Sequence, residues 1–363
     1  MASVGGTEVN VFQVARGLAA RGHSIDLVAA RGGDLMTAYR SFCRSVHRLP
    51  QLDFARSTAP RDLLRMVPAV AVAAAGRPDV VYPNRFAEIV WAVMAGRLSG
   101  APVVCHLHEI RHARPGNLPN VHVRRFIAVS ESLRREWEAT GLTPDRIDVV
   151  HNGVSLDDYP FGGLPERAIA REELGLPQKA FVVLYYGRLD REKGVEVLLD
   201  AWGRLGMEGD EGRLLLMGSA SAHLADGVEQ VERMRSIASP SCVWMPARPD
   251  VVTPLHAADV VVLPSVWSEP LGRVVIEAMA TGRPALASRV GGIPEMLGGD
   301  FTRFLFEAGD AAELARGLRR LVGWQTNEPG LAEACRGHVR DHFSFDAMVN
   351  GIEKVLLSAA GGD

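Results

Sequence analysis

Short apolar runs alternate with amphipathic segments along the whole chain. In the first half, runs dominated by apolar residues lie at 25–29, 79–82, 102–107, 126–129 and 147–150. Runs of this length are typical of strands that are buried on both faces of a parallel sheet. Between them, apolar residues recur at helical spacing over 7–21, 86–98 and 131–140. This alternation predicts βαβ units.

The second half of the chain repeats this pattern. Its apolar runs lie at 181–186, 214–217, 260–263 and 285–287. Helices are expected over 194–205, 223–237, 271–281 and 311–322. The chain therefore predicts an α/β fold with two doubly wound, Rossmann-like domains, one in each half.

Composition and periodicity place the domain boundaries. We expect an N-terminal domain over residues 1–155 and a C-terminal domain over 179–343. The stretch between them, 156–178, is rich in proline and glycine and predicts a linker. Residues 344–363 have helical spacing, so we expect a C-terminal helix that crosses back to the N-terminal domain.

The start of the chain departs from this plan. A doubly wound domain normally begins with a central strand, which a glycine-rich turn and a helix follow. Here Gly5 and Gly6 come almost directly after Met1, so we expect the first strand to be missing. Either the sequence starts late, for which a start site upstream of Met1 is our hypothesis, or another segment fills the position of that strand.

Composition argues against several classes of protein. Of the 363 residues, 47% are hydrophobic, and 40 Lys and Arg against 43 Asp and Glu leave a net charge of −3. That balance argues against a disordered chain and against a general nucleic-acid binder. The sequence has no apolar window of about 18 residues, so no transmembrane helix is expected. No signal peptide is expected either, because no basic-then-apolar start is present.

Cysteine is sparse, and no two cysteines form a C-x-x-C pair. The four cysteines are Cys43, Cys105, Cys242 and Cys335. We interpret them as buried thiols rather than as a disulfide or metal set, and we predict a cytoplasmic location.

The most informative segment, residues 264–277, follows a buried run and opens a predicted helix. Free N–H groups and the positive end of the helix dipole make such a place suitable for a diphosphate. Gly272 has no side chain, so a ligand can approach the backbone there. Glu269 could reach a sugar hydroxyl and Glu277 a ribose diol. The alternative is a solvated glutamate and a helix-capping one.

Two further loops carry candidate phosphate contacts. Arg188 and Lys193 lie in a Gly-Arg-x4-Lys-Gly loop between a strand and a helix, where two cations suit a diphosphate. For this loop alone, a solvated charged turn is the more probable alternative. Gly5 and Gly6 could bring the backbone close to a phosphate, but by themselves they are a weak signal, because a turn capped by Thr7 explains them.

A His-x-His pair, His106 and His108, ends one of the first-half strands. Ligands bind at strand ends in open α/β sheets, so we favour His108 as a polar site residue over an ordinary loop-edge histidine. We do not expect a metal site, because no third ligand is in evidence. The glycine-rich run 290–295 is either a loop that lines the site or a plain turn.

Taken in order, these motifs resemble the retaining glycosyltransferases of family 4, which have the two-domain GT-B architecture. The resemblance covers nearly the whole chain. Its further motifs are residues 21–23 (Arg-Gly-His), 128–130 (Ala-Val-Ser), 151–154 (His-Asn-Gly-Val) and 290–295 (Val-Gly-Gly-Ile-Pro-Glu), together with the Glu-x7-Glu pair. The missing first strand departs from the family pattern.

The resemblance implies two domains that face each other across a cleft and a nucleotide-diphospho-sugar donor, a UDP- or GDP-sugar. Arg188 and Lys193 would neutralise the leaving diphosphate, and Glu277 would bind the ribose. The donor sugar and phosphate would be held by Glu269 and by the backbone at Leu271, Gly272 and Arg273. From the first domain, His108 would line the donor sugar, and Gly5 and Gly6 would approach the diphosphate.

The resemblance also implies a reaction that needs no metal or other cofactor. Cations and helix-terminal amides can stabilise the leaving diphosphate, and the chain has no Asp-x-Asp motif. We find no carboxylate to serve as nucleophile, so same-face attack by the acceptor hydroxyl is our hypothesis. The acceptor, which residues 31–60 and 109–122 should shape, is a small molecule, a glycan or a lipid-linked molecule. Membrane contact through Arg134 and Arg135 is disfavoured by the net charge.

Other classes of protein fit the sequence less well. A sugar-nucleotide epimerase or hydrolase on the same fold is the nearest alternative. A periplasmic-type sugar-binding protein would need a signal peptide and would lack the paired cationic loop. Glu269 and Glu277 argue against an inactive partner subunit.

Overall fold

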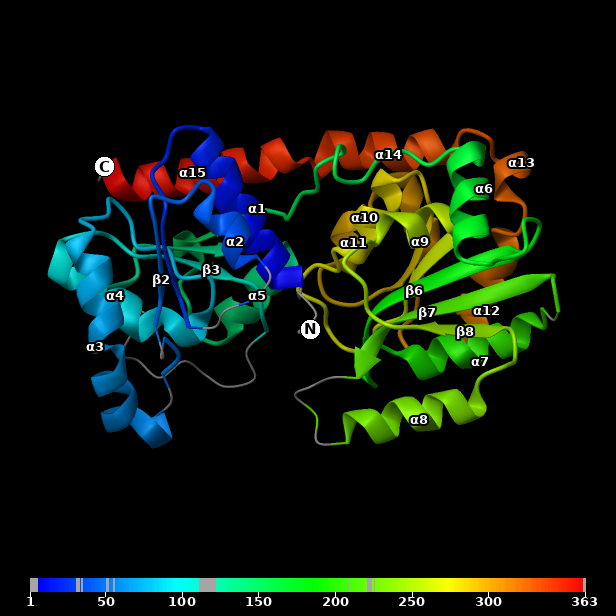
Figure 1. The fold of residues 1–363 in the computed structure, drawn as a ribbon, viewed down its shortest axis with the longest axis horizontal. Coiled ribbons are helices and arrows are strands. Elements are labelled where there is room, and N and C mark those ends of the chain that lie inside the picture. The colour runs from blue at the N-terminus through cyan, green and yellow to red at the C-terminus, as the bar shows by residue number, and fades with distance from the viewer. Residues whose placement is uncertain are drawn as a thin grey trace. The chain divides into compact units, whose positions relative to one another are not determined.

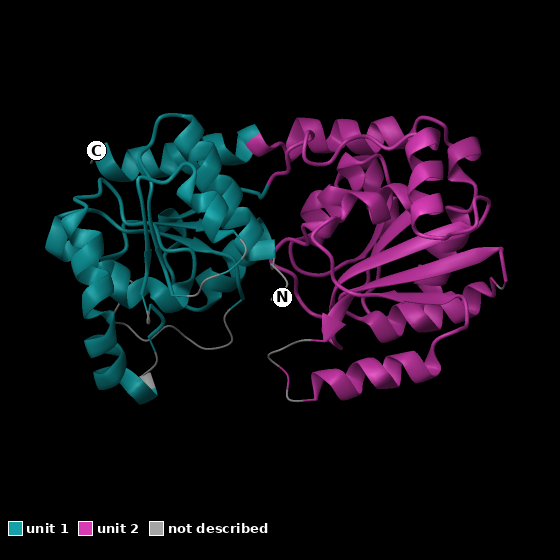
Figure 2. Ribbon diagram, in the orientation of Figure 1, with its two compact units in different colours: residues 1–152, 346–363 teal, residues 153–345 magenta. Residues whose placement is uncertain are grey.

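The computed structural model describes residues 6–30, 33, 35–49, 52–54, 56–110, 122–207, 209–220, 224 and 226–361. They fall into two compact units: unit 1 holds residues 1–152 and 346–363, and unit 2 holds residues 153–345 (Figure 2). Each unit is a parallel α/β assembly, as the alternating pattern predicts. Among the helices described, none is long and apolar enough to cross a membrane.

Unit 1 is built on short parallel strands. One sheet contains β3 (Val104–Leu107), β4 (Arg125–Ala128) and β5 (Ile147–Val149), and a second contains β1 (Asp26–Ala29) and β2 (Ser45–Arg48). The run at 79–82 was expected to be a strand, but in the described residues it forms an isolated bridge, Val81 to Val103. The missing-strand prediction and Gly5 fall on residues 1–5, which lie outside the described residues.

Among the described residues, six α-helices accompany these strands. They are α1 (Gly6–Ala20), α2 (Met36–Arg40), α3 (Ala59–Ala75), α4 (Ile89–Ser99), α5 (Glu131–Ala139) and α15 (Phe345–Gly361), with 3₁₀ turns at Arg56–Thr58, Phe86–Glu88 and Pro144–Arg146. The C-terminal helix α15 lies against the end of α1 (Figure 1). The Glu353 carboxylate bonds Arg21 at 2.7 Å and His23 at 2.6 Å.

Unit 2 contains a six-stranded parallel sheet in the order β11-β10-β9-β6-β7-β8. The strands are β6 (Phe181–Leu189), β7 (Gly212–Ala220), β8 (Cys242–Met245), β9 (Val260–Leu263), β10 (Ala285–Ser288) and β11 (Leu305–Phe306). The chain adds β7 and β8 on one side of β6, then places β9 on the other side and continues outward. The strand order therefore reverses between β6 and β9, and open α/β sheets bind ligands at the carboxyl edge of such a switch point.

Helices cover this sheet, and α7 and α12 lie side by side (Figure 1). The helices of unit 2 are α6 (Leu164–Glu173), α7 (Val195–Leu205), α8 (Gly227–Ile237), α9 (Val252–Ala257), α10 (Val274–Ala280), α11 (Ile293–Met296), α12 (Ala311–Arg320), α13 (Trp324–Asn327) and α14 (Leu331–His342), with a 3₁₀ turn at Gly299–Phe304.

The segment expected to be a linker, 156–178, contains α6 and packs within unit 2. Arg171 of this helix is fully buried, and its guanidinium donates to Asp259 Oδ2 over 2.8 Å. Pro165 lies in the first turn of α6, and Gly175 follows its end with a φ of +64°. Proline and glycine are common at these two ends of a helix, so here they mark its boundaries.

Candidate functional site

The loops that follow β6 and β9, the two strands at the switch point, are in direct contact. The amide of Val266 donates a hydrogen bond to the Glu192 carbonyl over 2.9 Å. Gly194 has a φ of +68°, and a Cβ on it would lie 1.9 Å from the carbonyl oxygen of Pro264. Because only glycine fits there, Gly194 lets the two predicted motifs meet at the carboxyl edge of the sheet.

Lys193 and Glu269 form an ion pair between these loops. Lys193 Nζ lies 2.5 Å from Glu269 Oε1, and the Ser265 hydroxyl donates to the same oxygen over 2.5 Å. The Glu269 side chain is 9% exposed and that of Lys193 is 21% exposed. The sequence predicts both as site residues, and the structure brings them together although they are 76 positions apart.

The glycine-rich loop 290–295 packs against the backbone of Glu269. The Gly292 amide donates to the Glu269 carbonyl over 2.8 Å. Gly291 has a φ of +54°, and a Cβ on it would lie 2.1 Å from that carbonyl oxygen. Of the two interpretations left open by the sequence, this contact favours a loop that supports the site.

Arg188 is about half exposed and has two acidic partners. Its guanidinium lies 3.0 Å from Asp190 Oδ2 and 3.4 Å from Glu192 Oε2. Asp190 is fully buried and also accepts a hydrogen bond from the Lys193 amide over 3.0 Å. Both predicted cations are therefore paired with carboxylates, and an incoming anion has to compete with these partners.

Backbone amides are available immediately before α10. Within the described residues, the N–H groups of Leu271 and Gly272 have no hydrogen-bond acceptor. Amides in this position are suited to an anion. Gly272 has a φ of +87°, and a Cβ on it would lie 2.9 Å from Leu263 Cδ2, so backbone geometry and packing both require glycine.

Glu277 is buried and has a partner on each carboxylate oxygen. The Tyr186 hydroxyl donates to Oε2 over 2.6 Å, and Arg273 Nε donates to Oε1 over 2.6 Å. Burial, and then the Glu277 carboxylate, raise the pKa of the Tyr186 phenol well above its ordinary value, so the phenol remains a donor. Burial would lower the pKa of Arg273, but its interactions with Glu277 and Tyr159 together outweigh this effect and raise it.

Sequence reasoning missed Tyr186 and the side chain of Arg273. Tyr186 ends an apolar run, so the pattern predicts a core strand position for it, and the pattern around Arg273 points to its backbone amide alone. The available signal was a phenol directly before the Gly187-Arg188 pair. A phenol at the carboxyl end of a central strand lies where ligands bind.

His108 lies in unit 1, just beyond β3. Its ring centroid is 4.0 Å from that of His106, whose Nδ1 is 2.6 Å from the Tyr82 hydroxyl. Burial lowers the pKa of His108 to about 4. Burial, followed by the neighbouring His108, lowers the pKa of His106 well below its usual value. Both imidazoles are therefore neutral at pH 7.

Gly6 is the first residue of α1, so it belongs to unit 1, as His108 does. The remaining described site residues lie in unit 2.

No group of three or more His, Cys, Asp or Glu side chains in the described part of the chain is placed to hold a metal ion.

Two family models match the chain. The model described as "Glycosyltransferase Family 4" matches residues 4–158, and that described as "Glycosyl transferases group 1" matches residues 166–334. Among curated proteins, the D-inositol 3-phosphate glycosyltransferase of Acidothermus cellulolyticus is 30% identical, with 98% of this chain and 86% of that protein covered. The protein of that name from Streptomyces coelicolor is 29% identical, with coverage of 98% and 87%.

Solved structures share the fold over nearly the full length. Anabaena Alr3699/HepE in complex with UDP and glucose has a TM-score of 0.83 at 23% identity, covering 99% of this chain and 97% of that chain. Sucrose-phosphate synthase from Thermosynechococcus elongatus has a TM-score of 0.76 at 23% identity, with coverage of 100% and 96%. At this level of identity the likeness shows the fold.

Proposed function

Because the chain belongs to glycosyltransferase family 4, we propose that it is a retaining enzyme that transfers a sugar from a nucleotide-diphospho-sugar to a hydroxyl acceptor. The family and the two-domain GT-B fold predicted from the sequence are confirmed by the family models and the structural neighbours. That the protein is a glycosyltransferase follows from its family. The donor, the acceptor and the stereochemistry are the proposal.

The contact between the loops after β6 and β9 carries the donor-site proposal. It joins Lys193 to Glu269 next to the unpaired amides of Leu271 and Gly272. Glycosyl transfer leaves a nucleoside diphosphate that gains negative charge as the sugar departs. Arg188 and Lys193 would exchange their carboxylate partners for this diphosphate, and the two amides would bind its oxygens.

The remaining site residues complete the donor site in this proposal. Glu269 holds a hydroxyl of the donor sugar, and Glu277 holds the ribose. His108 lines the donor sugar as a neutral hydrogen-bonding imidazole, and Gly5 and Gly6 approach the diphosphate. Since cationic side chains and amides supply the charge stabilisation, the reaction proceeds without a metal.

The reaction step is same-face attack. The acceptor hydroxyl attacks the anomeric carbon from the face on which the diphosphate departs, and its proton passes to a leaving phosphate oxygen. The bond between the anomeric carbon and the phosphate oxygen breaks as the new glycosidic bond forms. The configuration of the sugar is therefore retained.

For the donor, the HepE complex with UDP and glucose supports a UDP-sugar ahead of a GDP-sugar. For the acceptor, the names of the curated relatives support a phosphorylated polyol, D-inositol 3-phosphate being the first to test. A cytoplasmic location is in keeping with the four free cysteines.

A donor panel tests this proposal. Thermal shift with UDP- and GDP-sugars should identify one stabilising donor, and mass spectrometry with D-inositol 3-phosphate should then show a glycosylated product. Release of nucleoside diphosphate at the full rate without any acceptor would favour the alternative, a sugar-nucleotide hydrolase or epimerase. Stabilisation by no nucleotide sugar would contradict the assignment of the donor site.

A further inference from the structure

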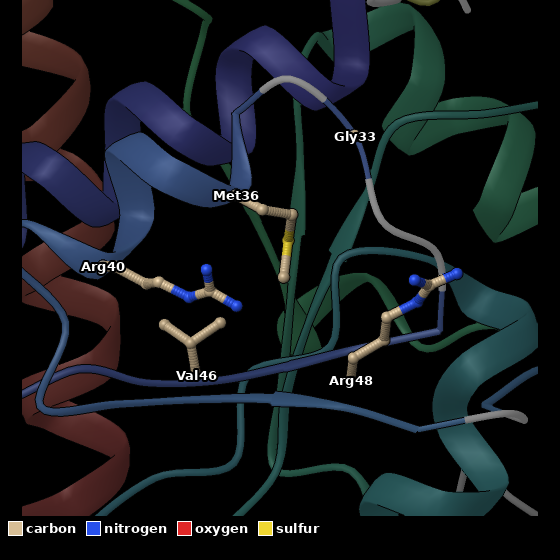
Figure 3. Close-up of a pocket in the computed structure, with 5 residues that line it drawn as sticks. All are labelled: Gly33, Met36, Arg40, Val46 and Arg48. Carbon is tan, nitrogen blue, oxygen red and sulfur yellow. The ribbon is translucent and has the colours of Figure 1, made fainter.

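Unit 1 contains a cavity of about 500 Å³ that the donor site does not use. It is lined by Gly33, Met36, Arg40, Val46 and Arg48. Figure 3 shows Met36 pointing between the side chains of Arg40 and Arg48. The volume lies within the range of small-molecule sites, about 300–1,000 Å³.

The fold explains why these side chains share one cavity. Val46 and Arg48 are two positions apart on β2, so they project from the same face of the sheet. Met36 and Arg40 are four positions apart on α2, so they lie on the same side of that helix. The resulting wall has an apolar part, formed by Val46 and Met36, and two guanidinium groups.

The two arginines of this cavity have no acidic partner among the described residues. In that part of the chain, neither guanidinium group has a hydrogen-bond or ion-pair partner, and none of the lining residues is acidic. The neighbouring Arg44, by contrast, donates from Nε to Asp26 Oδ1 over 3.0 Å. Two unpaired guanidinium groups beside one cavity favour an anion that accepts from both.

The cavity also lies where ligands are expected in this fold. Arg48 is the last residue of β2, and Gly33 follows the carboxyl end of β1. Parallel sheets present their ligand sites at this edge. Residues 31–60, which the sequence predicts as part of the acceptor region, include all five lining residues.

We infer that this cavity binds a phosphate monoester, held by Arg40 and Arg48, and that this phosphate belongs to the acceptor. Val46 and Met36 would contact the C–H face of the acceptor ring. The second half of the inference rests on the proposed function, whereas phosphate binding does not.

The test uses the full-length protein with Arg40→Gln, Arg48→Gln and the double variant. Arg135→Gln is the matched control, because Arg135 is an exposed arginine of unit 1 outside the cavity. Calorimetric titration with inorganic phosphate and with D-inositol 3-phosphate measures binding, and initial rates give kcat and KM. Circular dichroism and melting temperature verify that each variant is folded.

Each single substitution should weaken binding of D-inositol 3-phosphate and raise its KM about 10- to 100-fold, the range of a charge-assisted hydrogen bond. The kcat and the affinity for the donor nucleotide should change less than about twofold. Inorganic phosphate should compete with the phosphorylated acceptor. Arg135→Gln should behave as the unmodified protein.

Different outcomes separate the parts of the inference. Unchanged phosphate binding in the folded double variant would overturn the phosphate site. Phosphate binding that is lost in the double variant, without any effect on acceptor KM, would overturn the acceptor assignment alone. If no nucleotide sugar reacts, the proposed function fails, and phosphate titration still decides whether the cavity is an anion site.

Discussion

The Tyr186 hydroxyl donates a hydrogen bond to Glu277 Oε2 over 2.6 Å, joining the end of strand β6 to helix α10. On the other oxygen, Arg273 Nε donates to Oε1 over 2.6 Å. A carboxylate has about four lone-pair sites, so acceptor capacity remains on each oxygen. Two neighbouring acceptor oxygens suit the vicinal 2′- and 3′-hydroxyls of a ribose.

We predict that Tyr186→Phe reduces the ability of the site to distinguish ribose from 2′-deoxyribose. Without the phenol hydroxyl, the carboxylate loses a group that fixes its orientation, so affinity for UDP should fall about 5- to 10-fold, which is less than the loss of a direct hydrogen bond to a charged group. Affinity for 2′-deoxy-UDP should fall less. Calorimetric titration of both nucleotides measures the ratio.

Tyr39→Phe is the control for this experiment, because Tyr39 is a buried tyrosine of α2 in unit 1. It should leave both affinities unchanged. An unaltered ratio of UDP to 2′-deoxy-UDP affinity in folded Tyr186→Phe would show that the phenol does not position Glu277.

Replacement of either cation of the β6 loop should slow transfer without preventing folding. Arg188→Ala and Lys193→Ala each remove a positive charge that would stabilise the departing diphosphate, so we expect kcat to fall about 100-fold or more. Lys179→Ala removes an exposed lysine of unit 2 and should keep the full rate. Steady-state rates with a saturating donor provide the measurement, and unchanged rates in both variants would refute the diphosphate assignment.

Glu269→Gln should weaken productive binding of the donor sugar while preserving the shape of the loop. The amide still accepts a hydrogen bond from Ser265, but it no longer forms the ion pair with Lys193 that the carboxylate forms. We expect kcat/KM for the donor to fall about 10- to 100-fold, with UDP affinity changed much less. Full activity of this variant would remove Glu269 from the sugar site.

The sequence predicts most of the framework because buried parallel strands are nearly continuous apolar runs. Strand β2 does not have this pattern: Ser45, Val46, His47 and Arg48 include a single apolar residue, so the strand was not recognised. It was expected to form part of an acceptor loop. Residues 79–82 do have the pattern, yet the structure forms only an isolated bridge at Val81 there, followed by a hydrogen bond from the His106 amide to the Pro83 carbonyl over 2.9 Å.

The candidate site could likewise be predicted only in part from the sequence. The positions of Arg188, Lys193, Glu269 and Glu277 could be predicted because chemistry-bearing residues follow strands. Their partners could not, because the contacts cross long separations: Lys193 meets Glu269, and Tyr186 meets Glu277. That Arg40 and Arg48 have no acidic partner among the described residues is likewise visible only in the structure.

Gly194→Ala should separate the two loops that form the donor site. The new Cβ would require a left-handed backbone conformation and would meet the Pro264 carbonyl, so we expect a loss of about 2 kcal/mol or more in the free energy of unfolding. The matched control is Gly203→Ala in α7, where a Cβ meets nothing within 4 Å. In this control the free energy of unfolding should rise by about 0.5–1 kcal/mol. Urea denaturation measures both, and equal stabilities would contradict the close approach of the loops.

The neutral state of His108 predicts how stability depends on pH. Burial lowers the pKa of His108 to about 4, whereas a histidine in the unfolded chain takes up its proton near pH 6.5. Between these values the unfolded state binds more protons, so the free energy of unfolding falls as the pH is lowered. The contribution of His108 should lower the free energy of unfolding by about 1–2 kcal/mol between pH 7 and pH 5.

A difference measurement isolates this contribution, because Glu88 acts in the opposite direction. Burial raises the pKa of Glu88 to about 7, so its contribution to stability is lost as the pH rises from about 4.5 to 7. Denaturant titrations at pH 7 and pH 5 should therefore compare the unmodified protein with His108→Asn, which should lose less stability at pH 5. If His108→Asn leaves the pH dependence unchanged, His108 titrates alike in the folded and unfolded states, and its role as a neutral imidazole is wrong.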